Sequence, residues 1–181
     1  MQQHPDAVTG SDDVGGQDAG GEGAGGLTHL DAGGRAHMVD VADKPATART
    51  AVACCEVVMA PATAALLRDG GLPKGDALAT TRLAGIQAAK RTWELIPLCH
   101  QVALTSVEVD VEVDADAGLA VITATANAVD RTGVEMEALT AAGVAGLALI
   151  DLVKAVQRDV SIERLRLREK RGGRSGDVSL P

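Results

Sequence analysis

Residues 107–113 alternate valine with glutamate or aspartate at every position. Successive side chains of a β-strand point to opposite faces, so this run predicts a strand that buries valines on one face and exposes carboxylates on the other. Residues 114–118 have the composition of a turn, and residues 119–129 are then predicted to return as a second strand. A strand with one solvent-exposed face is typical of an antiparallel sheet. This pattern constrains the chain to a fold in which other elements cover only the opposite face of the sheet.

Helical segments are available to cover that sheet. Asp76 is a predicted N-cap for a helix over 77–91, and Pro61 can open a short helix over 62–68. The apolar stretch 134–157 predicts a long helix. Further strands are predicted over 37–41, 51–59 and 160–167. Together these elements predict an α+β protein with helices packed on one face of an antiparallel sheet.

The composition predicts one domain that gains from self-association. The 181 residues include one Trp and no Phe or Tyr, so the core must be built from Val, Leu, Ala and Ile. Such side chains bury little area each, and we therefore expect further burial between subunits of an oligomer. Gly143 and Gly146 weaken the long helix, so close approach of another backbone is expected to compensate there. The lack of aromatic side chains argues against single-stranded nucleic-acid binding.

The two ends of the chain differ from its middle. Residues 1–26 are rich in Gly and Asp, hold five carboxylates and contain no Lys or Arg, so we interpret them as a disordered acidic tail. Residues 27–170 are predicted to form the α+β domain, and the Gly- and Arg-containing residues 171–181 a flexible C-terminal segment. The formal net charge of −8 gives no support to a polyanion or a membrane surface as partner.

Cysteine usage and the N-terminus favour the cytoplasm. Three cysteines are too few for a disulfide framework, and Cys54 and Cys55 are neighbours that should point to opposite faces of a strand. There is no Cys-x-x-Cys pair for a structural zinc site. The first residues lack the basic and apolar regions of a signal peptide, and the longest apolar run, 138–150, has the length of a buried helix.

Several reactive side chains stand out of this apolar background. Lys74 lies in a loop before a predicted helix, where backbone N–H groups favour an anion, although a solvated loop lysine is the simpler interpretation. Cys99 and His100 follow Pro97-Leu98; taken alone, a capped surface histidine and a small buried thiol are simpler interpretations than a reactive pair. Glu135 and Glu137 begin the long helix, where the helix dipole accounts for one carboxylate more easily than for two.

Asp151 and Lys154 are spaced i, i+3 near the end of the same helix. On a surface such a pair contributes only a few tenths of a kcal/mol. However, Asp151 follows Leu149-Ile150, where we expect the helix to be half buried, and a lysine poised by burial beside a carboxylate is a sound general acid or base. Glu137 and Asp151 lie about 21 Å apart on a straight helix. If both serve one substrate, either that substrate is long or the pocket joins two subunits. The core of small side chains favours the second alternative, a site at a subunit interface.

Five motifs in the same order resemble the cyclic pyranopterin monophosphate synthase family, the molybdenum cofactor biosynthesis protein C family. The motifs are Lys74-Gly75-Asp76, the run 84–93 (AGIQAAKRTW), Ile96-Pro97-Leu98-Cys99-His100, the run 132–140 (TGVEMEALT) and Lys154-Ala155-Val156-Gln157. The resemblance extends over about residues 27–177, and includes Leu27-Thr28-His29 and residues 37–41.

The resemblance implies a catalytic domain with a ferredoxin-like fold, assembled as a homohexamer, a trimer of dimers with pockets at dimer interfaces. It implies a lyase that rearranges 3′,8-cyclo-7,8-dihydro-GTP, the product of a radical GTP cyclase, into cyclic pyranopterin monophosphate and releases pyrophosphate. No resident cofactor or metal is implied, although magnesium could accompany the triphosphate.

The resemblance also implies roles for particular residues. Asp151, Lys154 and Lys74 match the catalytic group. The remaining matches bind substrate or line its pocket: Leu98, Cys99, His100, Glu135, Met136, Glu137, Lys170, Arg49 and His37. Local lysines and Arg49 would bind the triphosphate despite the negative net charge, and a Lys/Asp pair can transfer protons.

Two other classes of function remain open at this stage. A non-catalytic nucleotide-binding oligomer would share the phosphate-binding lysines but would not need Asp151 or the paired glutamates. A zinc cyclohydrolase would use Cys99 and His100 as metal ligands.

Overall fold

The computed structural model of the protein describes residues 33–174 and 176–181, so the predicted acidic tail 1–26 lies outside the described residues. The elements in chain order are β1 (Thr47–Val58), α1 (Pro61–Arg68), α2 (Ala77–Ala89), α3 (Thr92–Leu95), β2 (Leu104–Asp114), β3 (Leu119–Asp130), α4 (Glu135–Val153), β4 (Ser161–Arg171) and β5 (Val178–Ser179).

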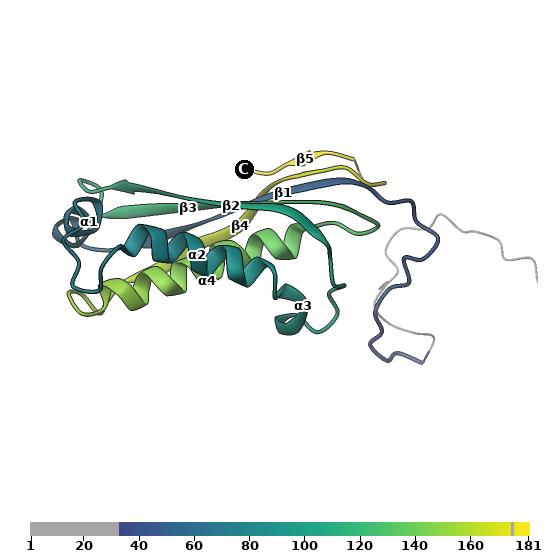
Figure 1. Ribbon diagram of the computed structural model, residues 1–181, viewed down its shortest axis with the longest axis horizontal. Coiled ribbons are helices and arrows are strands. Elements are labelled where there is room, and N and C mark those ends of the chain that lie inside the picture. The colour runs from purple at the N-terminus through teal and green to yellow at the C-terminus, as the bar shows by residue number, and fades with distance from the viewer. Residues whose placement is uncertain (1–32, 175) are drawn as a thin grey trace, which may run out of the picture.

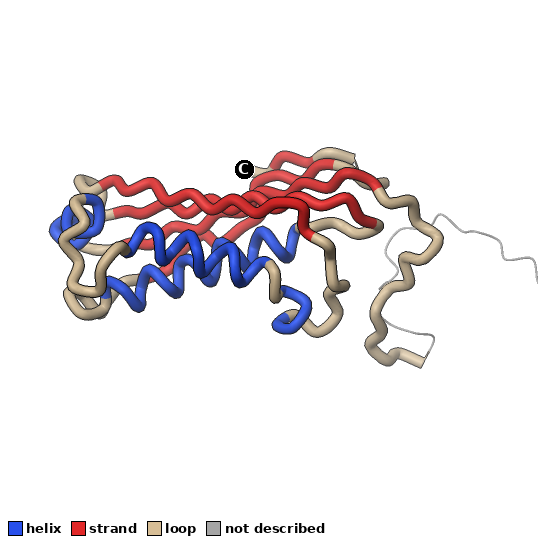
Figure 2. Tube along the Cα trace, in the orientation of Figure 1, coloured by secondary structure: helices blue, strands red, loops and turns tan. Residues whose placement is uncertain are grey.

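The strands form one antiparallel sheet in the order β2-β3-β1-β4-β5. Helices α2 and α4 lie side by side along one face of this sheet, and the short helices α1 and α3 lie toward its opposite ends (Figures 1 and 2). The predicted α+β class with helices on one face is therefore confirmed. The ferredoxin-like topology stays a prediction, with which the order β1-α2-β2-β3-α4-β4 is compatible.

The alternation in β2 works as the sequence predicts. Val109 and Val111 are buried against the helices, whereas Glu108, Asp110 and Glu112 are exposed. Where β1 and β3 face α4 the core is built mainly from alanine: Ala51, Ala53, Ala120, Ala124, Ala126, Ala138, Ala141, Ala142 and Ala145 are all fully buried. Small side chains on both layers let the helix lie close to the sheet.

Helix α4 is the central helix of the fold and packs on both the sheet and α2. Among the described residues it is the one helix long and apolar enough to cross a membrane by length and composition, yet half of it is buried inside the protein, as in a core helix. It packs on β1, β3, β4 and α2.

The close approach of backbones occurs on α2 rather than at the glycines of α4. A Cβ on Gly85 would lie 2.9 Å from the carbonyl oxygen of Ala141 on α4. A Cβ on Gly143 would meet only the tip of Leu165, and one on Gly146 would meet Ile162 and Cys55 side chains. The expectation that Gly143 and Gly146 face another backbone is therefore wrong: both face side chains of the sheet.

Several predicted elements differ from the observed ones in their existence or in their ends. Residues 37–41 form no strand; they run as a loop, and the carbonyl of Val39 accepts a hydrogen bond from His100 Nε2 at 2.8 Å. The predicted helices 77–91 and 134–157 end earlier, at Ala89 and Val153. Strand β5 was not predicted; it pairs with β4 through Lys170 and Glu169, next to the candidate site.

Candidate functional site

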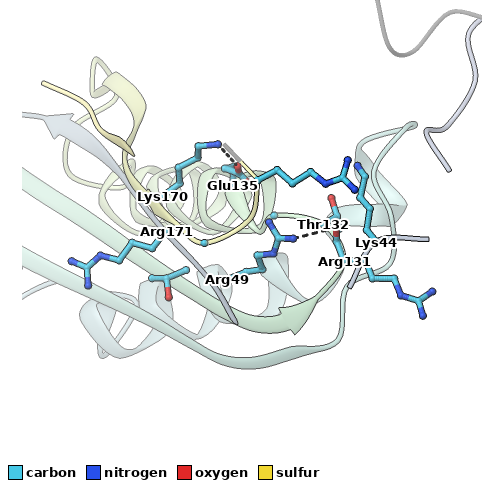
Figure 3. A pocket seen from close by; sticks show the side chains of 11 residues that line it. Lys44, Arg49, Arg131, Thr132, Glu135, Lys170 and Arg171 are labelled. Carbon is cyan, nitrogen blue, oxygen red and sulfur yellow. Dashed lines mark hydrogen bonds and ion pairs between the residues drawn. The ribbon is translucent and has the colours of Figure 1, made fainter. Parts of the chain in front are cut away.

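A strongly basic cavity opens at the end of the sheet where α4 begins. It has a volume of about 260 Å³, and six of its eleven lining residues are Lys or Arg. The basic residues come from four separate segments: Lys44, Arg49, Arg131, Lys170, Arg171 and Arg174 (Figure 3). We call this the cationic cavity. Its charge suits a phosphate or another anion, in a chain whose net charge is negative.

Two of these cations are held in place by β1, β4 and the turn after β3. Arg49 donates from Nε to the carbonyl of Asp130 at 3.2 Å and from Nη2 to the carbonyl of Arg131 at 3.4 Å. Lys170 Nζ lies 3.8 Å from Glu135 Oε1 (Figure 3). The antiparallel register that pairs Ala51 with Lys170 brings the end of β4 beside the start of β1. Residues far apart in the sequence therefore line one cavity.

A second cavity of about 210 Å³ adjoins the first, and we call it the neutral cavity. It is lined by Leu98, Cys99, His100, Met136 and Glu137, and it shares Lys44, Thr132, Gly133 and Glu135 with the cationic cavity. The shared residues make the two cavities neighbours along one wall. Such a pair suits a ligand with an anionic part and a flatter, more apolar part.

The neutral cavity contains a buried carboxyl group. Glu137 is 4 % exposed, and burial raises its pKa to about 7, with smaller contributions from Glu135 and Asp130. Burial also raises the pKa of the Cys99 thiol, and the charge of Glu137 adds to that effect. Cys99 is therefore held as the thiol, which is the poorer nucleophile and metal ligand. Glu137 can hold or release a proton near neutral pH.

A separate polar cluster lies at the other end of α4. Lys74 donates to the Asp151 carbonyl oxygen at 2.7 Å and to Oδ2 at 2.9 Å, while Lys154 Nζ lies 2.6 Å from Oδ1. The hydrogen bonds from the two lysines to the Asp151 carboxylate lower its pKa to about 2, and the bond from Lys154 has the larger effect. We call these three residues the Lys-Asp-Lys cluster. The side chain of Asp76 caps α2 by accepting from the Ala79 N–H, as predicted, and so fixes the loop that carries Lys74.

One expectation about this cluster is wrong. Asp151 was expected at a half-buried position, with Lys154 poised by burial. Their side chains are instead 55 % and 56 % exposed in the single chain, and that of Lys74 is 38 % exposed. The last turn of α4 buries Leu152 and Val153 in the core, so Asp151 and Lys154 lie on its opposite, solvent-facing side.

The predicted site residues thus form two groups at opposite ends of one helix. Arg49, Lys170 and Glu135 line the cationic cavity, and the neutral cavity is lined by Leu98, Cys99, His100, Met136, Glu137 and again Glu135. Lys74, Asp151 and Lys154 form the distant cluster. His37 is exposed and lines neither cavity. Within one chain the two groups do not meet.

Four basic residues of the cationic cavity were not singled out from the sequence: Lys44, Arg131, Arg171 and Arg174. Each looks like an ordinary surface residue in its own segment, and only the fold brings them together. Arg131-Thr132-Gly133, between a strand and a helix, is the one local signal that could have pointed to this cavity.

The described residues give little basis for a metal centre at Cys99 and His100. No group of three or more His, Cys, Asp or Glu side chains within the described ranges is arranged to hold a metal ion. His100 donates to the carbonyl of Val39, and a catalytic zinc site needs three protein ligands.

The fold and these groups define an α+β protein with a phosphate-suited cavity, a neutral cavity beside it and a Lys-Asp-Lys cluster. The chain belongs to the MoaC family, whose family model matches residues 38–173. It is 55 % identical over 155 residues to the cyclic pyranopterin monophosphate synthase of Chloroflexus aurantiacus, covering 86 % of this chain and 95 % of that protein.

Two further relatives carry the same name. The protein of Thermomicrobium roseum is 57 % identical over 150 residues, covering 83 % of this chain and 90 % of the relative. The protein of a Methylobacterium species is 58 % identical over 153 residues, covering 84 % of this chain and 96 % of the relative. The resemblance found in the motifs is confirmed at the level of the family.

Proposed function

We propose that this chain is a lyase that converts 3′,8-cyclo-7,8-dihydro-GTP into cyclic pyranopterin monophosphate and pyrophosphate, the reaction of molybdenum cofactor biosynthesis that the family resemblance implies. The observation that carries the proposal is the adjacency of the cationic and neutral cavities, together with a Lys-Asp-Lys cluster in a chain of this family. A radical GTP cyclase would supply the substrate.

The cavities divide such a substrate between them. The triphosphate would occupy the cationic cavity, where Arg49 and Lys170 offer charge-assisted hydrogen bonds. The ring system would occupy the neutral cavity beside Leu98, His100 and Glu137. The reaction needs no resident cofactor, because it transfers protons and a phosphoryl group without a redox change. Magnesium would arrive with the triphosphate.

The Lys-Asp-Lys cluster would supply the proton transfers and stabilise the leaving group. In forming the cyclic phosphate, a hydroxyl oxygen of the sugar-derived part attacks the α-phosphorus, and the bond from that phosphorus to pyrophosphate breaks. The hydroxyl proton passes to a base, and lysines stabilise the departing charge. Asp151 keeps Lys74 and Lys154 together, ready for these tasks.

The cluster and the cavities are too far apart on α4 to act on one substrate within a chain. Fourteen residues of helix span about 21 Å. We therefore propose that the complete pocket joins the cavities of one subunit to the cluster of another, in a homohexamer built as a trimer of dimers. Exposed Leu83 and Leu147 on the outer surfaces of α2 and α4, 63 % and 61 % exposed, support burial against a further subunit.

A cytoplasmic location suits a biosynthetic enzyme with three free cysteines.

The decisive experiment is to incubate the purified protein with the cyclised dihydro-GTP and to measure the pyranopterin product and pyrophosphate together. The wild-type protein should form both in equal amounts. Asp151→Asn should lose about 10²–10⁴-fold in turnover, the range typical of a lost proton-transfer group. Glu108→Gln, on the exposed face of β2, is the matched control and should retain turnover.

Thermal melts and oligomer size must be the same for both variants. A folded Asp151→Asn protein with wild-type turnover would contradict the proposed mechanism. Binding of the nucleotide without any product from the wild-type protein would favour the non-catalytic nucleotide-binding oligomer instead.

A further inference from the structure

Gly133 lies directly before α4, on the wall shared by the two cavities. A Cβ at this position would overlap Oε2 of Glu135 and would lie 2.6 Å from its Cδ and 2.8 Å from its Oε1. Gly133 is not among the described residues with positive φ, so its backbone does not require glycine. The missing side chain instead makes room for the carboxylate of Glu135 to fold back over the first turn of the helix.

Glu135 is the one carboxylate among the described residues that line the cationic cavity. An ionised carboxylate beside a phosphate site lowers the affinity for the anion by like-charge repulsion. Its ion pair with Lys170 is long, at 3.8 Å, and joins two partly exposed side chains, so it contributes little. Neither effect explains why a glycine leaves room for the carboxylate at this point.

The position of Glu135 suggests what it binds. It lines both cavities, so its carboxylate stands between the part of a ligand that carries phosphate and the part that carries the rings. An ionised carboxylate has acceptors only, and therefore needs a donor from the ligand. In a nucleotide the group between the phosphates and the base is the sugar, whose donors are hydroxyl groups.

We propose that Gly133 is a positioning residue that sets Glu135 to accept a hydrogen bond from a sugar hydroxyl of the bound nucleotide. This inference rests on the proposed function, because it takes the ligand to be a nucleoside triphosphate derivative. It makes Glu135 a specificity residue for the hydroxyl-bearing middle of the ligand, with the cationic cavity binding phosphate regardless of the sugar.

Binding to the full-length protein, measured by calorimetry with three probes, tests this assignment. The probes are GTP, 2′,3′-dideoxy-GTP, which lacks both sugar hydroxyls, and inorganic tripolyphosphate. The wild-type protein should bind GTP about tenfold or more tightly than the dideoxy compound, the size expected of one hydrogen bond to a charged group. Gly133→Ala and Glu135→Gln should both lose this preference, while binding tripolyphosphate at least as tightly as the wild type.

Two controls separate positioning from damage to the fold. Gly143→Ala, a glycine on α4 without positive φ and outside both cavities, should keep the full preference for GTP. In a Glu135→Ala background the further change Gly133→Ala should alter nothing, because the group that Gly133 positions is gone.

The proposal would be overturned if the wild-type protein did not distinguish the two nucleotides, or if Gly133→Ala kept the preference. Loss of tripolyphosphate binding in Glu135→Gln would also overturn it, since Glu135 would then act by holding Lys170. Wild-type turnover of the cyclised dihydro-GTP is a separate readout. Product formation without sugar discrimination refutes the Gly133 inference alone, whereas no product refutes the proposed function.

Discussion

Glu137 is the residue whose protonation the fold controls in the neutral cavity. Its pKa rises from an ordinary 4.5 to about 7, mainly because the side chain is buried. The folded protein therefore keeps a proton on Glu137 at pH values where the unfolded chain has released it. Stability gained from this proton is present below about pH 4.5 and is lost as the pH rises through 7.

We predict that Glu137→Gln, which mimics the protonated acid, removes this loss. Between pH 4.5 and 8 the free energy of unfolding of the wild type should fall relative to that of the variant by up to about 3 kcal/mol. Urea unfolding of both proteins at matched concentration over this pH range measures the difference. A constant difference at all pH values would show that Glu137 does not titrate in this range.

At this scale the sequence singled out candidate site residues, whose roles stay predictions, but not the surroundings of those residues. Every predicted site residue lies within the described residues. Most of those that line the cavities stand in the quoted motifs, whereas Arg49 and Lys170 were implied by the family resemblance alone. The exposure of Asp151 and the basic residues Lys44 and Arg174 were not found. Burial and cavity lining depend on which segments meet, and that information is spread over the whole chain.

At the scale of elements, the strongest local patterns were sufficient. The alternation in β2 and the apolar length of α4 fixed the sheet and its main helix, because each pattern reports one buried face. Residues 37–41 have strand-like side chains but pair with no strand among the described residues, so they stay a loop beside His100. The two-residue strand β5 is too short to carry a pattern; it forms because the edge of β4 offers unpaired backbone groups.

The contact between α2 and α4 gives a prediction for Gly85. In Gly85→Ala the new methyl group would press on the Ala141 carbonyl at 2.9 Å and on Val109 Cγ2 at 3.0 Å. We expect a net destabilisation of about 1–3 kcal/mol from overpacking, despite the better helix propensity of alanine. Gly143→Ala is the matched control; it meets only the tip of Leu165 at 3.3 Å and should change stability by less than about 1 kcal/mol. Chemical denaturation ranks the two, and equal stabilities would contradict the close packing at Gly85.

At the scale of the whole molecule, the distance along α4 is the reason for proposing a pocket shared between subunits. The cavities and the Lys-Asp-Lys cluster lie at opposite ends of this helix, and a single chain leaves the cluster exposed. Alanine and valine bury little apolar area each, so the core of a single chain is limited. A large interface between subunits would add to the buried area.

A protein that begins at Leu27 should keep both its assembly and its turnover, because residues 1–26 have no core-forming pattern. Sedimentation at micromolar concentration should show an oligomer and no folded monomer. A shortened protein that falls apart would give the tail a structural role, and a fully active monomer would refute the shared pocket.

Subunit complementation tests the central claim, a pocket shared between chains, most directly. Lys170→Ala disables the cationic cavity and Asp151→Asn the distant cluster, so each variant alone should be nearly inactive. Co-expressed in equal amounts, the two variants form mixed dimers in which one of the two pockets is intact. Random pairing in a two-fold dimer then restores about a quarter of the wild-type turnover. Turnover that stays at the level of the separate variants would contradict the shared pocket.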